Sequence, residues 1–489
     1  MKIKALSRSV EGNTRSNSGD IKKLSRNLDP KHKPLERARE YTRAVTSAKL
    51  ERMFAKPFVA ALEGHVDSVA CSAASRGHLC PFVTGGVDGE IRVWDLASRR
   101  TVWNNKTSHT GAVNGVCISN DGKSFFSCST DKTIKQWGLG VKMAGGRKEK
   151  RKRKEKGVLD SDSDSDGDSD SDSEVKKSST SSDSSKNPAP LNSWLFSDTF
   201  KSMDHHWNEE QFTTASDEAV QVWSHHRSNP IQTYEPFNGT DSCNVVRWNP
   251  SERSLLAHTS SDRGIGLHDT RASSSLRKTV LRMRSNCLEW NPMEPMNFVV
   301  GNEDHNCYSF DMRKLSQPTM VHKGHVGAVL SIGWSSTGRE FVTGSYDRTI
   351  RIFNYRSGTS RDSYYAKRMQ RVFCVNYTAD AKFIVSGSDD TNLRIWKARS
   401  NEKLGQQLVR EERATNYRNT LVKKFEHMPE VRNIVKSRNM PKFVKKQTAM
   451  AQIQHASAKR KEGNIIKHSK KGSVAWKGER AKAIVKEYE

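Results

Sequence analysis

The sequence predicts an all-β fold, a closed ring of seven similar β-blades with a basic, partly helical extension at each end. Three observations predict it. An Asp followed six residues later by an aromatic or His side chain recurs along the chain. The copies are spaced like propeller blades, and one apolar strand before the first copy has no blade of its own. The chain therefore divides into an N-terminal extension (1–56), a ring (57–398) and a C-terminal extension (399–489).

The clearest copy of the repeat spans residues 324–354. An alternating apolar run ends at Trp334, a second run covers residues 341–344, and a third follows the turn at Asp347 and ends near Phe353. A period of two between turn residues predicts three short strands. One such unit cannot bury its own faces, so further copies are expected.

In the other copies, too, an aromatic or His residue follows the Asp by six residues. The positions of these aromatic or His residues differ successively by 43, 86, 45, 42, 43 and 43. This is the propeller period of about 40 to 45 residues. The doubled gap is filled by residues 142–190, which predicts an insert between blades two and three. The pairs are Asp88/Trp94, Asp131/Trp137, Asp217/Trp223, Asp262/His268, Asp304/Phe310, Asp347/Phe353 and Asp390/Trp396.

These copies resemble WD40 repeats, and two expectations follow from the resemblance. In WD40 rings the N-terminal strand completes the last blade, so residues 56–62 are expected to pair with the blade that ends near Trp396 and to remove the free sheet edges. In a WD40 blade a loop His, a strand Ser or Thr, a turn Asp and a strand Trp form a buried hydrogen-bonded chain.

The resemblance implies such networks in three blades. A structural role is predicted for them rather than catalysis, because buried polar groups need partners and a satisfied network makes a blade rigid. The third set has Phe353 in place of Trp and so lacks the indole donor. The network residues are His65, Thr84, Asp88 and Trp94; His109, Ser127, Asp131 and Trp137; and His325, Thr343 and Asp347.

Charge is concentrated in the two extensions. The net charge of the 489 residues is +27, but residues 1–56 carry 15 Lys+Arg against 6 Asp+Glu and residues 397–489 carry 24 against 9. The ring is nearly neutral, so the extensions are predicted to bind an anionic partner. The candidate contacts to RNA or ribonucleoprotein are Arg37, Arg39, Arg432, Lys436, Arg438, Lys442, Lys445, Lys446, Lys459, Arg460 and Lys461.

Several classes of function are not predicted. The eight cysteines stand singly, which favours reduced, mostly buried thiols over a zinc site or a disulfide framework. No phosphate-binding glycine loop or nucleophile elbow is present, so we expect no enzyme, cofactor or small-molecule substrate. The start lacks the apolar run of a signal peptide, and no stretch reaches the length of a membrane helix, so no membrane association is expected.

The insert opens with a basic cluster and continues with alternating Ser and Asp. Such blocks of like charge predict a disordered loop. The basic cluster is a candidate nuclear localisation signal, and the serines suit an acidophilic kinase; a solubilising spacer is the alternative. The candidates are Lys150, Arg151, Lys152, Arg153 and Lys154 for localisation, and Ser161, Ser163, Ser165, Ser169 and Ser171 for phosphorylation.

Helices are predicted in both extensions. Residues 34–55 form a helix whose Leu35, Ala38, Val45, Ala48 and Phe54 are either a docking stripe or part of a solvated basic helix. In the tail, helices are expected over 402–425 and from residue 441 to about 461, and they are expected to order on binding. Aromatic residues are sparse there, so contact with phosphates is favoured over base stacking.

Four stretches go beyond a generic repeat. Residues 26–30, 36–41 and 49–58 resemble the N-terminal signature of the Sof family of nucleolar WD40 proteins, and residues 290–294, 302–306 and 311–313 resemble its fifth blade. Lys-Arg-Met-Gln-Arg-Val-Phe at 367–373 and His-Met-Pro-Glu-Val at 427–431 complete the match. The resemblance implies a nuclear, nucleolar, non-enzymatic component of the small-subunit processome. Its partners would be pre-rRNA, small nucleolar ribonucleoprotein components and other processome proteins.

A second function comes from the same resemblance. Animal members of the family resemble substrate receptors of cullin–RING ubiquitin ligases, in which paired Asp-x-Arg motifs on successive blades bind the ligase adaptor. Asp269/Arg271 and Asp311/Arg313 match that motif, although His268 and Phe310 stand where Trp is usual. The alternatives are that each Arg caps its own blade or contacts another partner.

Overall fold

The computed structural model describes residue 17 and residues 35–79, 81–139, 189–235, 242–272, 274–470, 472–474 and 478–488. The chain forms two compact units. The larger unit contains Pro57–Arg399 and Asn439–Glu489, and the smaller contains Met1–Lys56 and Ser400–Arg438.

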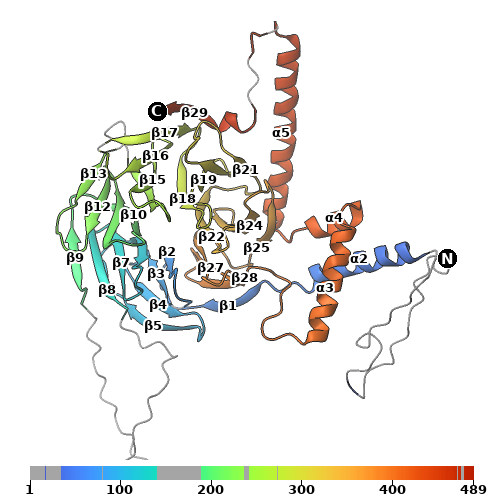
Figure 1. The fold of residues 1–489 in the computed structure, drawn as a ribbon, viewed down its shortest axis with the longest axis horizontal. Coiled ribbons are helices and arrows are strands. Elements are labelled where there is room, and N and C mark those ends of the chain that lie inside the picture. The colour runs from blue at the N-terminus through green and yellow to red at the C-terminus, as the bar shows by residue number, and fades with distance from the viewer. Residues whose placement is uncertain are drawn as a thin grey trace, which may run out of the picture. The chain divides into compact units, whose positions relative to one another are not determined.

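The larger unit is built, over the described ranges, as a ring of seven antiparallel sheets, and the predicted seven-bladed propeller is confirmed (Figure 1). The strands of a blade are lettered a to d from the centre outward. Blade one is β2 (Val69–Ala74), β3 (Phe82–Gly86), β4 (Ile91–Asp95) and β5 (Arg100–Asn105); blade two is β6 (Val113–Ile118), β7 (Ser124–Ser129), β8 (Thr133–Gly138) and β9 (Asn192–Leu195); blade three is β10 (Phe200–His205), β11 (Gln211–Ser216), β12 (Val220–Ser224) and β13 (Gln232–Tyr234).

The remaining blades follow the same order along the chain. Blade four is β14 (Cys243–Trp248), β15 (Leu255–Ser260), β16 (Gly264–Asp269) and β17 (Ser275–Leu281); blade five is β18 (Ser285–Trp290), β19 (Asn297–Asn302), β20 (Cys307–Asp311) and β21 (Met320–His322); blade six is β22 (Val329–Trp334), β23 (Glu340–Ser345), β24 (Ile350–Asn354) and β25 (Ser360–Tyr364); blade seven is β26 (Val372–Tyr377), β27 (Phe383–Ser388), β28 (Leu393–Lys397) and β1 (Phe58–Leu62).

Two blades depend on strands from the ends of the chain. The N-terminal strand β1 pairs with β28, with Phe58 opposite Trp396 and Leu62 opposite Leu393, as ring closure predicts. Blade four has a fifth strand, β29 (Ile484–Tyr488), which pairs with β17 at its outer edge (Figure 1). The sequence did not predict β29, because a short strand in a charged tail carries no alternating pattern strong enough to mark it.

The predicted position of the insert is wrong. Strand β9 pairs with β8 and is the outer strand of blade two, so the gap at residues 140–188 lies inside blade two rather than between blades two and three. The fourth strand of a blade is hard to predict because it lies at the outer edge. In β5, for example, exposed residues alternate with partly buried ones, whereas β3 and β7 are buried throughout.

Antiparallel pairing gives the ring two distinct faces. Strands a and c run in one direction and strands b and d in the other, so all b–c turns and d–a connections lie on one face, named here the b–c face. The a–b and c–d turns lie on the opposite face, named the a–b face.

Glycine, cysteine and valine pack closely where neighbouring blades meet. A methyl group on Gly387 of β27 would lie 2.5 Å from Cys374 Sγ and 2.8 Å from Val69 Cγ1 of blade one. The same close approach recurs at Gly85 with Cys71 and Val113, and at Gly301 with Cys287 and Val329. The seven cysteines in the described part of the chain are free and buried, as expected, whereas Cys80 lies outside it.

The smaller unit joins the two extensions. Helix α2 (Glu36–Met53) packs against α3 (Val409–Lys424) and α4 (Pro429–Lys436) around Ala44, Ala48, Leu421 and Val431. Across this core Tyr41 Oη donates to Glu430 Oε2 at 2.8 Å, and Lys424 Nζ lies 2.6 Å from Glu40 Oε2. The docking stripe is thus present in part.

Val45 and Ala48 contribute to that helical core, whereas Leu35 and Phe54 are exposed. In the larger unit the tail continues as α5 (Lys442–His468) and the short η2 (Ala481–Ala483), so this helix extends beyond the predicted end near residue 461. Among the described residues no helix is both long enough and apolar enough to cross a membrane.

We predict that Gly387→Ala destabilises the protein by about 1 to 3 kcal/mol, because a new methyl group overpacks the contact between blades seven and one. Chemical denaturation measures the change. The matched control is Gly463→Ala in α5, where the new methyl group meets nothing within 4 Å and a better helix former replaces glycine. Equal stability of the two variants would contradict this account of the blade contact.

Candidate functional site

Blade two contains a complete hydrogen-bonded network of the expected kind. His109 Nε2 lies 2.8 Å from Ser127 Oγ, which also accepts the Trp137 indole N–H at 2.9 Å. On the other side of the imidazole, His109 Nδ1 lies 2.8 Å from Asp131 Oδ2. Burial raises the pKa of Asp131, but hydrogen bonds from Thr133 and the charge of His109 outweigh it and hold that pKa below its ordinary value.

Blade six has the same network without its last member. His325 lies 2.7 Å from Thr343 Oγ1 and 3.0 Å from Asp347 Oδ2, and Phe353 stacks on Phe341 where an indole would donate. Burial lowers the pKa of His325 even though Asp347 raises it, so the imidazole stays neutral. Both imidazoles and the hydroxyl groups that they contact are buried.

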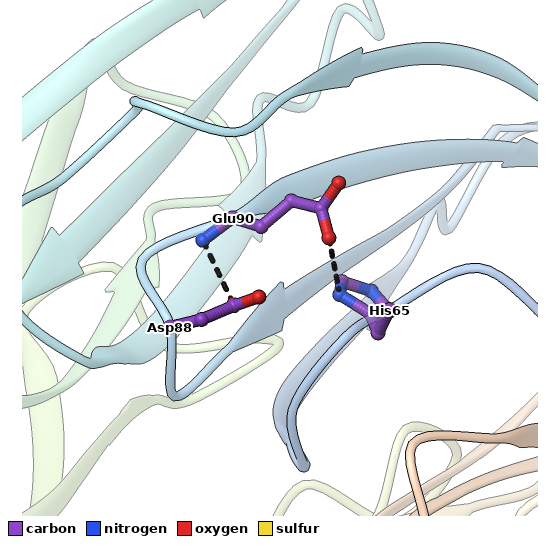
Figure 2. Close-up of side chains that lie close together, drawn as sticks. All are labelled: His65, Asp88 and Glu90. Atoms are coloured by element: carbon purple, nitrogen blue, oxygen red, sulfur yellow. Dashed lines mark hydrogen bonds and ion pairs between the residues drawn. The ribbon is translucent and has the colours of Figure 1, made fainter.

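In blade one the prediction for Asp88 is wrong. His65 Nε2 lies 2.8 Å from Thr84 Oγ1, and Trp94 donates to the same oxygen at 2.8 Å. The acidic partner of the imidazole, however, is Glu90, whose Oε2 lies 3.5 Å from His65 Nδ1 (Figure 2). Asp88 is exposed and accepts the backbone N–H of Glu90, because the longer Glu side chain reaches the ring from the buried side of the turn.

His65, Asp88 and Glu90 are also the one group in the described residues with spacing suited to a metal ion (Figure 2). Their chemistry does not favour one. The Arg92 guanidinium lies 2.7 Å from Glu90 Oε1 and already neutralises that carboxylate, so a cation would compete with a buried arginine. Burial, with Arg92 nearby, lowers the pKa of His65 to about 4.

The other blades replace the histidine network in different ways that the sequence pattern did not show. In blade seven Trp396 donates to Ser386 Oγ at 2.8 Å, and Arg394 forms an ion pair with Asp390. In blade four two histidines stand at the positions of the strand Ser or Thr and of the Trp. These are His258 and His268, whose ring centroids are 4.6 Å apart. Gly266 makes room for them, since a methyl group there would lie 2.2 Å from His258 Cε1.

The two Asp-x-Arg motifs lie in the c–d turns of blades four and five, on the a–b face. Asp269 accepts Arg271 Nε at 3.2 Å and Nη2 at 3.1 Å, and Asp311 accepts Arg313 Nε at 3.1 Å and Nη2 at 2.9 Å. Each Arg therefore pairs with its own carboxylate, yet 77% of the Arg271 side chain and 68% of the Arg313 side chain remain exposed. The forked pairing fixes each guanidinium without burying it.

The predicted RNA-contact residues fall into two groups. Arg37 and Arg39 lie exposed on α2, and Arg432 and Lys436 lie exposed on α4 of the same small unit. Arg438 just after α4 is half-buried and donates to the backbone O of Val435 at 2.6 Å. The second group is exposed along α5 and consists of Lys442, Lys445, Lys446, Lys459, Arg460 and Lys461.

A cavity of about 550 Å³ runs along the strands a, at the centre of the ring. Arg247 of β14 lines it, and its Nε lies 3.1 Å from Glu289 Oε2 of β18. Burial raises the pKa of Glu289, and the arginine offsets only part of that effect. Neither residue belongs to the repeat pattern, so sequence reasoning missed both of them. The candidate residues of the insert, Lys150–Lys154 and the five serines from Ser161 to Ser171, lie outside the described residues.

Comparison with known proteins connects these features to a family. The Sof1-like domain matches residues 398–484, and the WD domain, G-beta repeat, matches residues 56–95, 102–138, 316–354 and 360–397. Protein sof1 of Schizosaccharomyces pombe is 42% identical to this chain over 486 residues, covering 99% of both chains. The chain belongs to the Sof1-like family of WD40-repeat proteins.

Animal relatives extend the comparison. The "DDB1- and CUL4-associated factor 13" proteins of Danio rerio and Homo sapiens are 42% and 40% identical over 489 and 485 residues, again covering 99% of each chain. The resemblance to the Sof family seen in the sequence is thus confirmed. In this chain the Sof1-like domain begins at the end of blade seven and contains α3, α4 and α5.

We predict that acidification from pH 7 to pH 5 destabilises the folded protein in part through His65. Its folded pKa of about 4 lies below the ordinary value of 6.5, so the unfolded chain takes up a proton first and stability is lost as pH falls through this window. The loss from this residue is about 2 kcal/mol. In His65→Gln the difference in unfolding free energy between the two pH values should shrink by that amount.

Denaturant titrations at pH 7 and pH 5 measure this difference. His226→Gln is the matched control, because the His226 side chain is 79% exposed, in contrast to buried His65, and its partner Glu210 at 2.9 Å is exposed as well. An unchanged difference in His65→Gln, or an equal decrease in His226→Gln, would show that burial of His65 is not the cause.

Proposed function

We propose that this chain is a non-enzymatic assembly factor of the small-subunit processome in the nucleolus, needed for maturation of small-subunit rRNA. The propeller acts as a scaffold for proteins, and the basic helices contact pre-rRNA or small nucleolar ribonucleoproteins through phosphates. Membership of the Sof1-like family supports this, as does the position of the cationic residues on the surface.

The observation that carries the proposal is the charge of α5. Over Lys442–His468 the helix has seven Lys and Arg residues and one acidic residue, Glu462. Glu462 is paired with Lys482 at 2.5 Å, so most of the positive charge of α5 is not neutralised by its own acids. Only Val444 of this helix is buried, and a long exposed cationic helix is a favourable surface for a phosphate backbone.

The basic residues of α5 lie in two clusters, Lys442/Lys445/Lys446 and Lys459/Arg460/Lys461. We predict that changing all six to Ser weakens binding to small-subunit rRNA fragments and flattens its salt dependence, because fewer counterions are released. The matched control changes the five lysines to Arg and keeps the charge. In cells depleted of the protein, the Ser variant should leave small-subunit precursors accumulated, and the Arg variant should rescue processing.

Filter binding at several salt concentrations and analysis of rRNA precursors provide the two measurements. Normal precursor processing after depletion of the protein itself would exclude the processome role. Unchanged RNA affinity of the Ser variant would exclude α5 as the contact.

A second candidate function is that of a substrate receptor for a cullin–RING ligase. The names of the animal relatives state an association with DDB1 and CUL4, and the two exposed Asp-x-Arg forks of this chain favour the same partner class. Two guanidinium groups fixed on neighbouring blades of one face offer a rigid, directional contact for a complementary protein surface.

We predict that the Arg271→Ala/Arg313→Ala double variant loses association with the ligase adaptor, since both fixed cations are removed from the contact. Arg356→Ala is the matched control. It occupies the corresponding c–d turn of blade six, where Asn354 stands in place of the Asp. Co-purification of adaptor with the wild type and the variants measures the effect, and full retention by the double variant would rule out this contact.

A further inference from the structure

The b–c turns of the propeller adopt a backbone conformation that favours glycine. In blade one this position is Gly89, with φ +84°. Four other blades place a basic or imidazole side chain at the same position: Lys132 (φ 65°), Arg263 (φ 71°), His305 (φ 71°) and Arg348 (φ 63°). In the left-handed region a side chain costs about 1 kcal/mol or more, so Gly would build these turns with less strain.

The turn itself does not require a basic residue. In each case the Asp before the positive-φ residue accepts the backbone N–H of the residue that follows that position. Thr349 N–H donates to Asp347 Oδ1 at 3.0 Å, and Gly264 N–H donates to Asp262 Oδ1 at 2.8 Å. Blade one makes the same bond from Glu90 N–H to Asp88 at 3.1 Å with glycine between them. Blade seven makes the same turn with Thr391 (φ 69°), so the fold itself does not select the positive charge of Arg263 and Arg348.

The d–a connections bring further basic residues to this face. Arg263 Nη1 donates to the backbone O of Arg282 at 3.5 Å, which places these two residues side by side. Between blades six and seven, the Arg371 guanidinium lies over the ring of Tyr346, 4.6 Å from its centroid, and Tyr346 is two residues from Arg348. The exposed residues Arg263, Arg282, Arg348, Lys367, Arg368 and Arg371 are named here the basic crescent.

Acidic residues in this part of the b–c face have basic or imidazole partners. Asp262 pairs with buried Lys278, Asp347 with His325 and Asp390 with Arg394. At the surface Glu303 pairs with exposed Arg284, and Asp389 lies 4.0 Å from Arg371 and offsets part of the charge of that crescent residue. Over blades one and three, by contrast, acidic side chains at Asp67, Asp88 and Glu218 are exposed. The propeller is nearly neutral as a whole, but its charge is separated on this face.

Helix α5 begins next to the crescent. Met440, two residues before α5, has its Sδ 3.4 Å from Arg351 Nη2, and Arg351 lies three residues after Arg348 in blade six. Figure 1 shows α5 rising from beside β24 and β25. The exposed Lys442, Lys445 and Lys446 at the start of this helix therefore extend the positive surface of the ring.

We propose that the basic crescent is an RNA-binding surface of the propeller itself, which holds a phosphate backbone that continues along α5. This inference rests on the proposed function and adds a second contact to it. Exposed point charges around a rim suit the repeated, single-charge groups of a nucleic-acid backbone. The Asp-x-Arg forks lie on the opposite face, so RNA on the crescent leaves them accessible.

The test uses full-length protein, transcribed fragments of small-subunit rRNA, and polyglutamate as an acidic polypeptide. Arg263→Gly/Arg348→Gly should lower the slope of log K against log salt by about 2 and weaken RNA binding. Its stability should not fall, since Gly relieves the positive φ. The control, Lys123→Ser/Arg339→Ser, removes two exposed charges from a–b turns of the opposite face and should bind RNA like the wild type.

The outcomes separate this inference from the proposed function. Weak, salt-independent RNA binding by the wild type overturns both. Steep binding by the wild type with an unchanged slope in the Gly variant overturns only the crescent. An equal loss in the control variant, or a loss of polyglutamate binding with RNA binding retained, also overturns it. If the Gly variant is unstable, Arg263→Asn/Arg348→Asn replaces it, because Asn tolerates the left-handed conformation.

Discussion

The pairing of β1 with β28 is the interaction on which the rest of the structure depends. It supplies the outer strand of blade seven from the N-terminal end, so the last blade has four strands like the others and the ring is closed. It also fixes where both extensions start, because Lys397 N–H donates to Pro57 O at 2.8 Å and Lys56 N–H donates to Ser400 O at 3.3 Å. Two segments more than 340 residues apart in the chain are thereby joined, and within the smaller unit α2 shares a core with α3 and α4.

The polar residues that mark the repeats are buried inside the blades and interact with groups of their own blade. His65, His109 and His325 are buried and held neutral by desolvation, with hydroxyl and carboxylate partners that the blade itself provides. A neutral imidazole bonded to hydroxyl and carboxylate groups of its own blade, as at His109 and His325, makes that blade rigid. His65 keeps the hydroxyl contact, but its Nδ1 makes no hydrogen bond and lies 3.5 Å from Glu90. The surfaces proposed here for partners therefore lie on residues that the repeat does not require. These are the Arg of each Asp-x-Arg fork, the arginines at positive φ and the lysines of α5.

These surfaces are separated by the strand order of the blades. Antiparallel blades send c–d turns to one face and b–c turns to the other, so the forks at Asp269 and Asp311 are on the opposite side of the ring from Arg263 and Arg348. A protein adaptor and an RNA would not compete for the same surface. The two proposed functions would therefore use different faces of one molecule. Strand β29 adds to this arrangement, since it covers the outer edge of blade four and ties the end of the Sof1-like tail to the ring.

The sequence by itself determined the number of blades, the closure of the propeller and the family. The reason is that the alternation of apolar and polar residues, the spacing between each Asp and the following aromatic or His residue, and the tail motifs are all local patterns. It also identified the histidine networks of blades two and six. Tertiary structure decided what local patterns do not encode. Strand β9 belongs to blade two because it pairs across the insert with β8, and Glu90 replaces Asp88 because side-chain length and burial select the partner of His65. Only the fold places Arg282 beside Arg263, and Arg371 over Tyr346, because residues 19 and 25 apart come together only when turns and connections of one face converge.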